Sequence, residues 1–497
     1  MATSTQVRLL QNYVNGRWVA PAGTGELDVV NPATQDVLAR VPLSAGEDLE
    51  QAVSAARAAF PAWRSRSTIE RARWLFSLRE ALMGAREELA RLVVTEMGKT
   101  LADARAEVGR MIEMVECACA VPTTMQGRVL ENVAAGVDCE TVRQPVGVCA
   151  AIVPFNFPAM VPFWFLPFAV ATGNTFVLKP SEQVPLTQNR VFELIDELGL
   201  PPGVVNLVNG DREVAQAILE SPGIDAVSFV GSAPVAAHVY ATAAAHGKRV
   251  QALGGAKNHM VVMPDAVIDR AVEGILASSF GAAGQRCMAG SVVVTVAEAA
   301  ERLIGPLTEA ARALRVGDGL DPEVNVGPVI SCAARERIED AIAAAAASGA
   351  QLAVDGRGVN GPDGAFVGPT ILTGVTPDMD IVRQEVFGPV LAIVEAADLG
   401  EAIEIVNASP YGNGTSIFTE SGAAVRRYRH DVEAGMVGVN VGVAAPVAFF
   451  PFSGWKASFL GDLHAHGTDA VDFYTRKKTV TSRFFTEQAQ EKLFGEH

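Results

Sequence analysis

The sequence predicts an α/β protein whose first half forms a nucleotide-binding domain around a mostly parallel, doubly wound sheet. Short apolar segments alternate with amphipathic helical segments along most of the chain, which is the pattern of such sheets. Hydrophobic residues make up 49% of the chain and charged residues 19%, as in compact enzymes with a large buried core. Because 497 residues exceed what one ordinary core holds, we expect two or three domains.

The chain is predicted to begin with a short strand at residues 12–19 and a helix-rich stretch at residues 45–119. Segments rich in β-branched residues predict further strands at residues 143–151, 175–178, 204–208, 226–229 and 261–263. Helices are expected between them, at residues 188–199, 212–219 and 233–245. A second alternation of strands and helices covers residues 266–440, and a polar strand-like tail lies at residues 471–483.

Charge and hydropathy argue against several classes of partner. The formal net charge of −16 disfavours nucleic acid and anionic lipid surfaces. Prolines interrupt the apolar stretch at residues 150–177, so we expect a buried strand, a loop and an apolar helix there rather than a membrane span. The N-terminus has neither an apolar signal core nor an Arg-rich presequence, and a cytoplasmic protein is expected.

The six cysteines form no CxxC pair and no Cys/His cluster with zinc-site spacing, so no metal is expected. Most of these thiols should be small buried hydrophobes, but Cys287 differs. It follows the small-residue sequence GAAGQR at residues 281–286, which lets the backbone turn tightly and expose the next side chain. Arg286 and backbone N–H groups would stabilise its thiolate. On local chemistry alone, an inert thiol in an Ala/Gly-rich helix is an equal alternative.

Two loops are candidates for binding a nucleotide, although the fingerprint GxGxxG of dinucleotide-binding folds is absent from the first half of the chain. Gly231 and Ser232 follow a predicted strand and precede a helix, where backbone N–H groups can meet a phosphate. Lys179 and Glu182 follow another strand and could hydrogen-bond ribose hydroxyls. Taken singly, each is more often an ordinary loop with a solvated charge pair.

Seven segments, in order along the chain, resemble the aldehyde dehydrogenase superfamily. They are YVNGRWV at 13–19, PFNFP at 154–158, ATGNTFVLKPSE at 171–182, FVGS at 229–232, GQRC at 284–287, QEVFGPV at 384–390 and FPFSGWKAS at 450–458. The resemblance implies a Rossmann-like NAD-binding domain, an α/β catalytic domain and a small β oligomerisation arm. It assigns residues 1–125, 144–252 and 441–469 to the NAD-binding domain, 253–440 to the catalytic domain, and 126–143 with 470–489 to the arm.

The resemblance also implies roles for single residues. Cys287 would be the nucleophile that carries a thioester, and the Asn156 amide would join the Cys287 backbone N–H in an oxyanion hole. Lys179 and Glu182 would hold the adenosine ribose of NAD, and Glu182 would repel the 2′-phosphate of NADP. The remaining expected cofactor-binding residues are Gly231 and Ser232 by the pyrophosphate, Glu385 and Phe387 at the nicotinamide ribose and ring, and Phe155.

One departure from the general family points to a branch of it. Hydrolytic members carry a Glu that activates the deacylating water, but the corresponding position here is Leu253, with no carboxylate within three residues. A thiol cosubstrate is the natural replacement, because thiolates attack thioesters readily. This loss and the segments GAKNH, GAAGQRCMA and GWKASFLGDLH resemble the methylmalonate-semialdehyde dehydrogenases. That branch oxidises malonate or methylmalonate semialdehyde with coenzyme A, releasing acetyl-CoA or propionyl-CoA and carbon dioxide.

A semialdehyde with a free carboxylate needs a cationic partner, best supplied by guanidinium groups. Arg286 flanks the nucleophile, and Arg110 matches a second Arg of the branch, although a solvated helix arginine is the alternative for Arg110. Ala465-His466 stands where the branch carries an aromatic residue, which could shift substrate preference. The resemblance implies a dimer or tetramer. Two other functions stay open: an enzyme that releases a free acid, using water placed by another group, and a catalytically retired binding protein.

Overall fold

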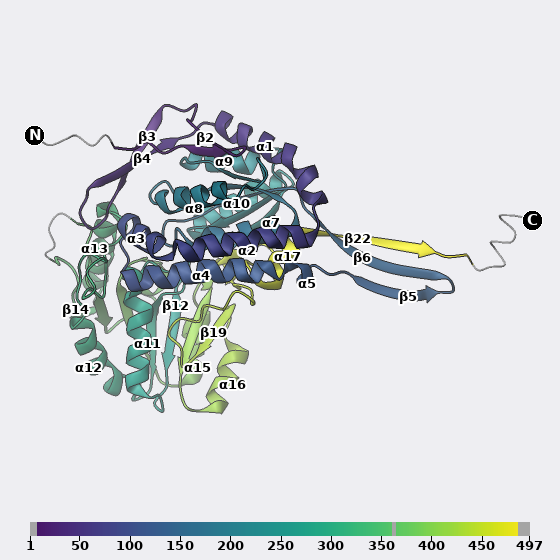
Figure 1. The fold of residues 1–497 in the computed structure, drawn as a ribbon. Helices are drawn as coiled ribbons and strands as arrows, with labels where there is room; N and C mark the ends of the chain where they lie inside the picture. The colour runs from purple at the N-terminus through teal and green to yellow at the C-terminus, as the bar shows by residue number, and fades with distance from the viewer. Residues whose placement is uncertain (1–6, 360–363, 486–497) are drawn as a thin grey trace, which may run out of the picture.

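An eight-stranded sheet organises the first half of the chain in the computed structural model, which describes residues 7–359 and 364–485 (Figure 1). Its central strands are parallel, and antiparallel strands close both edges. The mostly parallel sheet predicted from the alternating pattern is therefore present. In spatial order its strands are β2 (Arg17–Val19), β1 (Asn12–Val14), β9 (Val205–Leu207), β8 (Thr175–Lys179), β7 (Val148–Ile152), β10 (Ala226–Val230), β11 (Arg249–Leu253) and β21 (Phe459–Leu460).

Both faces of this sheet are covered, which explains why its central strands read as continuous apolar runs. In β7, Cys149 and Ala151 face a cluster formed with the helices α2, α3 and α4, while Val148, Ala150 and Ile152 face the other side. The helices of the first face are α2 (Thr68–Gly84), α3 (Arg86–Met97), α4 (Leu101–Cys119), α5 (Val121–Thr124), α6 (Met160–Phe163), α7 (Leu166–Thr172), α8 (Leu186–Glu197) and α17 (Gly467–Phe473). Those of the second face are α1 (Gly46–Ser65), α9 (Arg212–Glu220) and α10 (Ala233–Ala245).

A seven-stranded sheet organises the second half, as the alternation over residues 266–440 predicts. Its strands are β14 (Gln351–Val354), β15 (Thr370–Thr373), β16 (Val390–Ala396), β13 (Gly290–Val296), β12 (Asn258–Val262), β18 (Gly414–Phe418) and β19 (Met436–Val439). Its helices are α11 (Ile268–Phe280), α12 (Ala299–Arg312), α13 (Cys332–Ala347), α14 (Asp380–Arg383), α15 (Leu399–Asn407) and α16 (Gly422–Asp431). Two small pairs complete the body: β3 (Gly25–Val30) with β4 (Val37–Leu43), and β17 (Tyr411–Gly412) with β20 (Trp455–Lys456).

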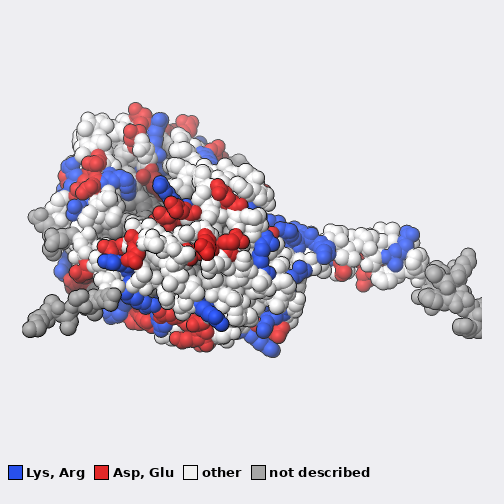
Figure 2. Space-filling view, turned by 90° about the horizontal axis from the view of Figure 1, so that it is seen from above, with Lys and Arg blue, Asp and Glu red and all other residues white. Residues whose placement is uncertain are grey.

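A three-stranded antiparallel arm projects from the body (Figure 1). It is formed by β5 (Arg128–Ala134), β6 (Val137–Pro145) and β22 (Thr475–Arg483), and the space-filling view shows it as a narrow rod (Figure 2). The strands β5 and β22 are largely exposed along their length. Residues 486–489 of the predicted arm lie outside the described residues. That the arm binds another copy of the chain stays a prediction.

Three predicted strands differ from the structure. Residues 12–19 form two strands joined by an Asn15-Gly16 turn with positive φ at both positions, which is the turn that suits a hairpin. The predicted strand at residues 143–151 is divided between the arm strand β6 and the buried strand β7. The predicted tail strand at 471–483 begins as the helix α17, whose Val471 and Phe473 pack into the body.

The apolar stretch at residues 150–177 folds as predicted, into the end of β7, a loop, the short helices α6 and α7, and the start of β8. Among the described residues, no helix is both long and apolar enough to cross a membrane.

Candidate active site

Cys287 lies in a turn at the end of α11 rather than in a helix. Ala282 and Ala283 have φ values of 49° and 52°, a left-handed conformation that carries the chain away from the helix axis. A Cβ at Gly284 would lie 2.1 Å from the Gly388 carbonyl oxygen, so only glycine fits there. The small residues of this segment thus form the tight turn that the sequence predicts.

The thiol lies between two cavities. One, of about 290 Å³, is lined by Pro154, Phe155, Asn156, Val230, Gly231, Ser232, Gly254, Gly255, Cys287, Arg337, Glu385 and Phe387. The other, of about 320 Å³, is lined by acidic, basic and large apolar side chains, among them Asp103, Glu107, Arg110, Trp164, Arg286, Cys287, Phe452 and His466. Of the described residues, Cys287 alone lines both, so a ligand in either cavity can reach its sulfur.

The first cavity brings together most of the residues expected to bind NAD. The rings of Phe155 and Phe387 meet edge to face, with their centroids 5.8 Å apart. The Glu385 carboxylate accepts a hydrogen bond of 3.1 Å from the Ala256 N–H. Its other oxygen lies so close to Gly255 that an added Cβ would stand 2.6 Å away. Flat, apolar walls with one carboxylate suit a ring carrying a ribose diol.

Gly231, Ser232, Lys179 and Glu182 occupy the carboxyl ends of two parallel strands of the same sheet. Gly231 and Ser232 lie between β10 and the start of α10, where the helix N-terminus favours an anion, and the Gly231 N–H itself donates to the Leu253 carbonyl oxygen at 3.1 Å. Lys179, at the end of β8, forms a 2.8 Å ion pair with Glu182. The Lys179 side chain is almost fully buried, while that of Glu182 keeps 33% of its surface exposed. These groups fit a phosphate and a ribose, the parts of NAD remote from its reactive ring.

The resting thiol is protonated, although Arg286 and backbone N–H groups favour its thiolate as the sequence predicts. Burial and the Glu385 carboxylate raise the pKa of Cys287 to about 12, although the N–H groups of residues 287 and 288 and the Arg286 guanidinium oppose this shift. Desolvation of the buried sulfur, together with the Glu385 charge, outweighs these favourable groups. A bound ligand or a base must therefore help to remove the proton.

Two other groups beside the thiol are strongly shifted by burial. The pKa of Glu385 is raised to about 7, mainly by desolvation, against the opposing Ala256 N–H and the cations Lys257 and Arg337. The pKa of Lys257 is lowered to about 8 by burial, against the Glu385 charge. Glu385 can therefore exchange a proton near neutral pH at the wall of the thiol's cavity.

The two predicted carboxylate-binding arginines line the second cavity, each with an acidic partner. Arg286 pairs with Asp103 at 2.5 Å. Arg110 pairs with Glu113 at 2.5 Å and also donates to the Pro446 carbonyl oxygen. Both guanidinium groups are mostly buried and fixed in place, so Arg110 is not the freely solvated helix arginine of the alternative reading. Each guanidinium carries five donors, and these pairs leave some of them available to a ligand.

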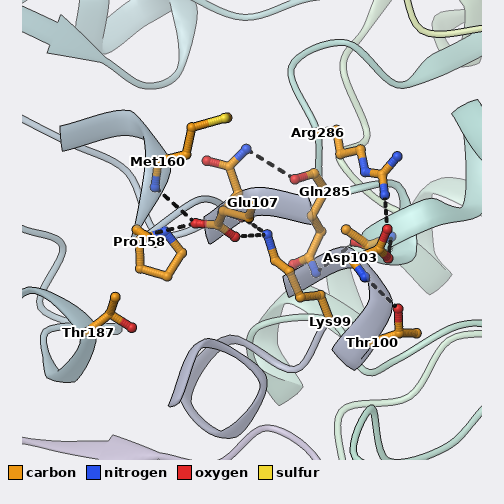
Figure 3. A network of polar contacts seen from close by, with 12 residues as sticks. Lys99, Thr100, Asp103, Glu107, Pro158, Met160, Thr187, Gln285 and Arg286 are labelled. Atoms are coloured by element: carbon orange, nitrogen blue, oxygen red, sulfur yellow. Dashed lines mark hydrogen bonds and ion pairs between the residues drawn. The ribbon is translucent and has the colours of Figure 1, made fainter. Parts of the chain in front are cut away.

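Asn156 adjoins the nucleophile's turn through its side chain. Its Nδ2 donates to the Gln285 carbonyl oxygen at 3.1 Å, which leaves the second N–H of the amide for another acceptor. The Asn156 carbonyl oxygen accepts from the buried Lys99 ammonium, which pairs with Glu107 (Figure 3). Sequence reasoning missed Lys99, Asp103 and Glu107, because spacing along the chain does not indicate which charges a fold buries together.

His466 also lines the second cavity. Its ring stands edge-on to Trp164 and Phe452, and its Nδ1 lies 2.7 Å from the Phe450 carbonyl oxygen. That carbonyl can only accept, so Nδ1 carries the proton and Nε2 is an acceptor. Burial lowers the pKa of His466 to about 3, and the ring is neutral.

Comparison with known proteins gives one consistent result. The model of the aldehyde dehydrogenase family matches residues 18–480. A malonate-semialdehyde dehydrogenase of Geobacillus kaustophilus (strain HTA426) is 53% identical over 97% of this chain and 100% of its own length. A malonate-semialdehyde dehydrogenase of Lacticaseibacillus casei is 51% identical over 97% of this chain and 98% of its own length.

Solved structures agree with the sequence comparison. A methylmalonate-semialdehyde dehydrogenase of Oceanimonas doudoroffii superposes with a TM-score of 0.95 at 45% identity, covering 98% of this chain and 100% of its own. A Sinorhizobium meliloti 1021 protein assigned to the methylmalonate-semialdehyde dehydrogenases, crystallised with NAD, has a TM-score of 0.95 at 43% identity. The coverage is 97% of this chain and 99% of that one.

Proposed function

The chain belongs to the aldehyde dehydrogenase family, and we propose that it oxidises malonate or methylmalonate semialdehyde with NAD and coenzyme A, yielding acetyl-CoA or propionyl-CoA and carbon dioxide. The observation that carries the proposal is the position of Cys287 between an arginine-bearing cavity and a cavity that suits a nicotinamide. The names of the relatives, at about half identity over nearly the whole chain, support the same substrates.

In the proposed reaction the Cys287 thiol gives its proton to water or to a neighbouring base, and the sulfur attacks the aldehyde carbon to form a tetrahedral adduct. The Asn156 amide and the Cys287 backbone N–H would stabilise the oxygen anion of that adduct. NAD, when bound, accepts the hydride that leaves the carbon, and a thioester on Cys287 remains. Phe155, Glu385 and Phe387 would orient the ring, while Lys179, Glu182, Gly231 and Ser232 would hold the rest of the cofactor.

The arginines explain why a semialdehyde with a carboxylate suits this site better than a simple aldehyde. Arg286 and Arg110 line the cavity on the substrate side of the sulfur, and charge-assisted hydrogen bonds from guanidinium to carboxylate are strong. Their acidic partners Asp103 and Glu113 keep the empty cavity from holding uncompensated positive charge. In the overall reaction the semialdehyde, NAD⁺ and the CoA thiol give the acyl-CoA, carbon dioxide and NADH, which balances atoms and charge.

Coenzyme A is proposed as the acceptor because the sequence has no carboxylate within three residues of Leu253. Leu253 is buried at the end of β11, within the same apolar cluster against which Cys287 packs. One observation favours the second function, release of a free acid: Glu385 lines the thiol's cavity with a pKa raised to about 7, suitable for a base that activates water.

A steady-state assay with malonate semialdehyde and NAD, with and without CoA, tests the proposal. We expect continuous NADH formation only with CoA present, acetyl-CoA as product, and at most one NADH per Cys287 in its absence. Sustained turnover without CoA, with acetate or malonate as product, would instead support the hydrolytic function. The Cys287→Ala variant, which should bind NAD but form no NADH, separates both from a retired protein.

A further inference from the structure

An ion pair without any exposed surface lies directly behind the proposed oxyanion hole. The Lys99 ammonium and the Glu107 carboxylate are 2.6 Å apart, and both side chains are 0% exposed. Lys99 comes just before α4, and Glu107 lies one turn beyond Asp103 on the same helix, so all three charges belong to one helical start (Figure 3). Burying two charges costs free energy that their mutual attraction does not always offset. A contribution to stability alone therefore does not explain the pair.

Both members of the pair hold the loop that carries Asn156. Lys99 Nζ donates to the Asn156 carbonyl oxygen at 2.7 Å. Glu107 Oε1 accepts from the N–H groups of Ala159 and Met160, at 2.8 and 3.2 Å. The backbone is therefore fixed at Asn156 itself and again three residues later.

The same helix holds the turn of the nucleophile. Asp103 accepts from the Ala282 N–H at 3.0 Å and from the Arg286 guanidinium at 2.5 Å. The Asn156 side chain joins the two segments by its hydrogen bond to the Gln285 carbonyl oxygen. The start of α4 thus sets the position of both proposed oxyanion donors, the Asn156 amide and the Cys287 N–H.

This arrangement matters because an oxyanion hole works only when its donors are aimed before the reaction, and displacements of about 1 Å can cost about a hundredfold in rate. A short side chain such as Asn takes its direction from its own peptide unit. Lys99 fixes that peptide unit by its carbonyl oxygen, and the ammonium also lies 3.9 Å from the centre of the Phe157 ring. Rotation of the peptide would break the bond to Lys99.

We propose that the buried Lys99–Glu107 pair is a positioning device for the Asn156 amide, so that Lys99 accelerates attack on the aldehyde without touching the substrate. This rests on the proposed function in one respect, that Cys287 attacks an aldehyde. Glu107 compensates the charge of Lys99 and fixes the loop downstream of Asn156. Both are positioning residues rather than catalytic ones.

Two substitutions separate positioning from stability. Lys99→Met alone leaves the Glu107 carboxylate buried and unpaired, and should lower the melting temperature. Adding Glu107→Gln removes that charge while keeping an oxygen for the Ala159 and Met160 N–H groups. We expect this double variant to regain most of the melting temperature but to remain at least about tenfold slower in the single-turnover NADH burst with propanal. Recovery of the burst rate together with the melting temperature would overturn the proposal.

Alkylation of Cys287 by iodoacetamide needs the sulfur but no oxyanion hole. The alkylation rate of the double variant should stay within about twofold of the wild-type rate. If the alkylation rate fell as much as the burst rate, the turn of the nucleophile would have moved instead. Glu96→Gln is the matched control, because Glu96 is also fully buried but accepts from the N–H groups of Leu186 and Thr187 instead of from the loop of Asn156. It should change the melting temperature but not the ratio of burst rate to alkylation rate.

A double-mutant cycle with Asn156→Ala provides a second test. If Lys99 acts through the Asn156 amide, Lys99→Met should slow the burst little further once that amide is gone. Equal slowing in both backgrounds would overturn the inference while leaving the proposed function intact. A wild-type protein that forms no NADH burst with any aldehyde would overturn the proposed function and this inference together.

Discussion

The Arg286 guanidinium, next to the nucleophile, donates to the Asp103 carboxylate at 2.5 Å and so links the turn of Cys287 to helix α4. The guanidinium is therefore oriented before any ligand arrives, and 18% of the Arg286 side chain remains exposed. A substrate carboxylate can add to this pair without having to draw the arginine out of water. If the pair serves substrate binding, its loss should weaken the binding of aldehydes that carry a carboxylate.

Arg286→Ala should raise the KM for malonate semialdehyde by about tenfold or more, because a charge-assisted hydrogen bond contributes roughly 1.5–3 kcal/mol. With propanal, which has no carboxylate, kcat/KM should change much less. Steady-state kinetics with both aldehydes gives the comparison, and Arg270→Ala on the exposed face of α11 is a control. An equal loss with both aldehydes would show that Arg286 supports the turn rather than the carboxylate.

The alkylation rate of Cys287 should rise about tenfold per pH unit from pH 7 to pH 10 without reaching a plateau. The reason is that burial and Glu385 raise the pKa of this thiol to about 12, so the reactive thiolate remains a small, growing fraction over this range. Iodoacetamide kinetics on the cofactor-free protein measures it, with Cys287→Ser to subtract the other cysteines. A plateau below pH 9 would contradict the raised pKa.

Glu182→Ala should shift the cofactor preference toward NADP. The carboxylate repels a 2′-phosphate, and its removal leaves the Lys179 ammonium, now unpaired, to attract one. We expect the ratio of kcat/KM for NAD to that for NADP to fall by about tenfold or more. Glu220→Ala, on α9, removes the same charge elsewhere and should leave the ratio unchanged. An unchanged ratio in Glu182→Ala would place the adenosine ribose elsewhere.

His466 should make the protein less stable in acid. Its pKa is lowered to about 3 by burial, so as the pH falls below 6.5 the unfolded chain binds the proton while the folded chain does not. The contribution of neutral His466 to the free energy of unfolding is fully present above pH 6.5 and is lost progressively toward pH 3. At pH 5 the loss is about 2 kcal/mol. Urea unfolding at pH 7.5 and pH 5 should show a smaller difference in the free energy of unfolding between the two pH values in His466→Asn than in the wild type. Equal differences in the two proteins would contradict this.

The sequence predicted those parts of the fold that have a distinctive pattern of apolar residues or prolines. The buried parallel strands β7, β8 and β10 appear as apolar runs in the sequence, and prolines correctly excluded a membrane span over residues 150–177. The strand at residues 471–483 was partly wrong, because Val471 and Phe473 alternate like strand residues but belong to a short helix that packs on the body. Local alternation over a few residues does not distinguish the two.

The site was predictable in its residue types but not in its electrostatics. The turn at Cys287 and its neighbours Asn156 and Glu385 came from motifs, and the structure places them around one cavity. The protonation of the thiol could not be foreseen, because the sequence places Arg286 next to Cys287 without showing that the sulfur is buried beside the Glu385 carboxylate. The role of Lys99 and Glu107 could not be predicted for the same reason, because the burial of a charged side chain depends on the folded chain.

Because Cys287 alone, among the described residues, belongs to both cavities, the two walls can diversify independently. A substitution in the second cavity, which His466 lines, changes the surroundings of one side of the sulfur and leaves the opposite wall untouched. Single mutations in the second cavity can thus change which aldehydes fit, while the residues of the first cavity stay the same.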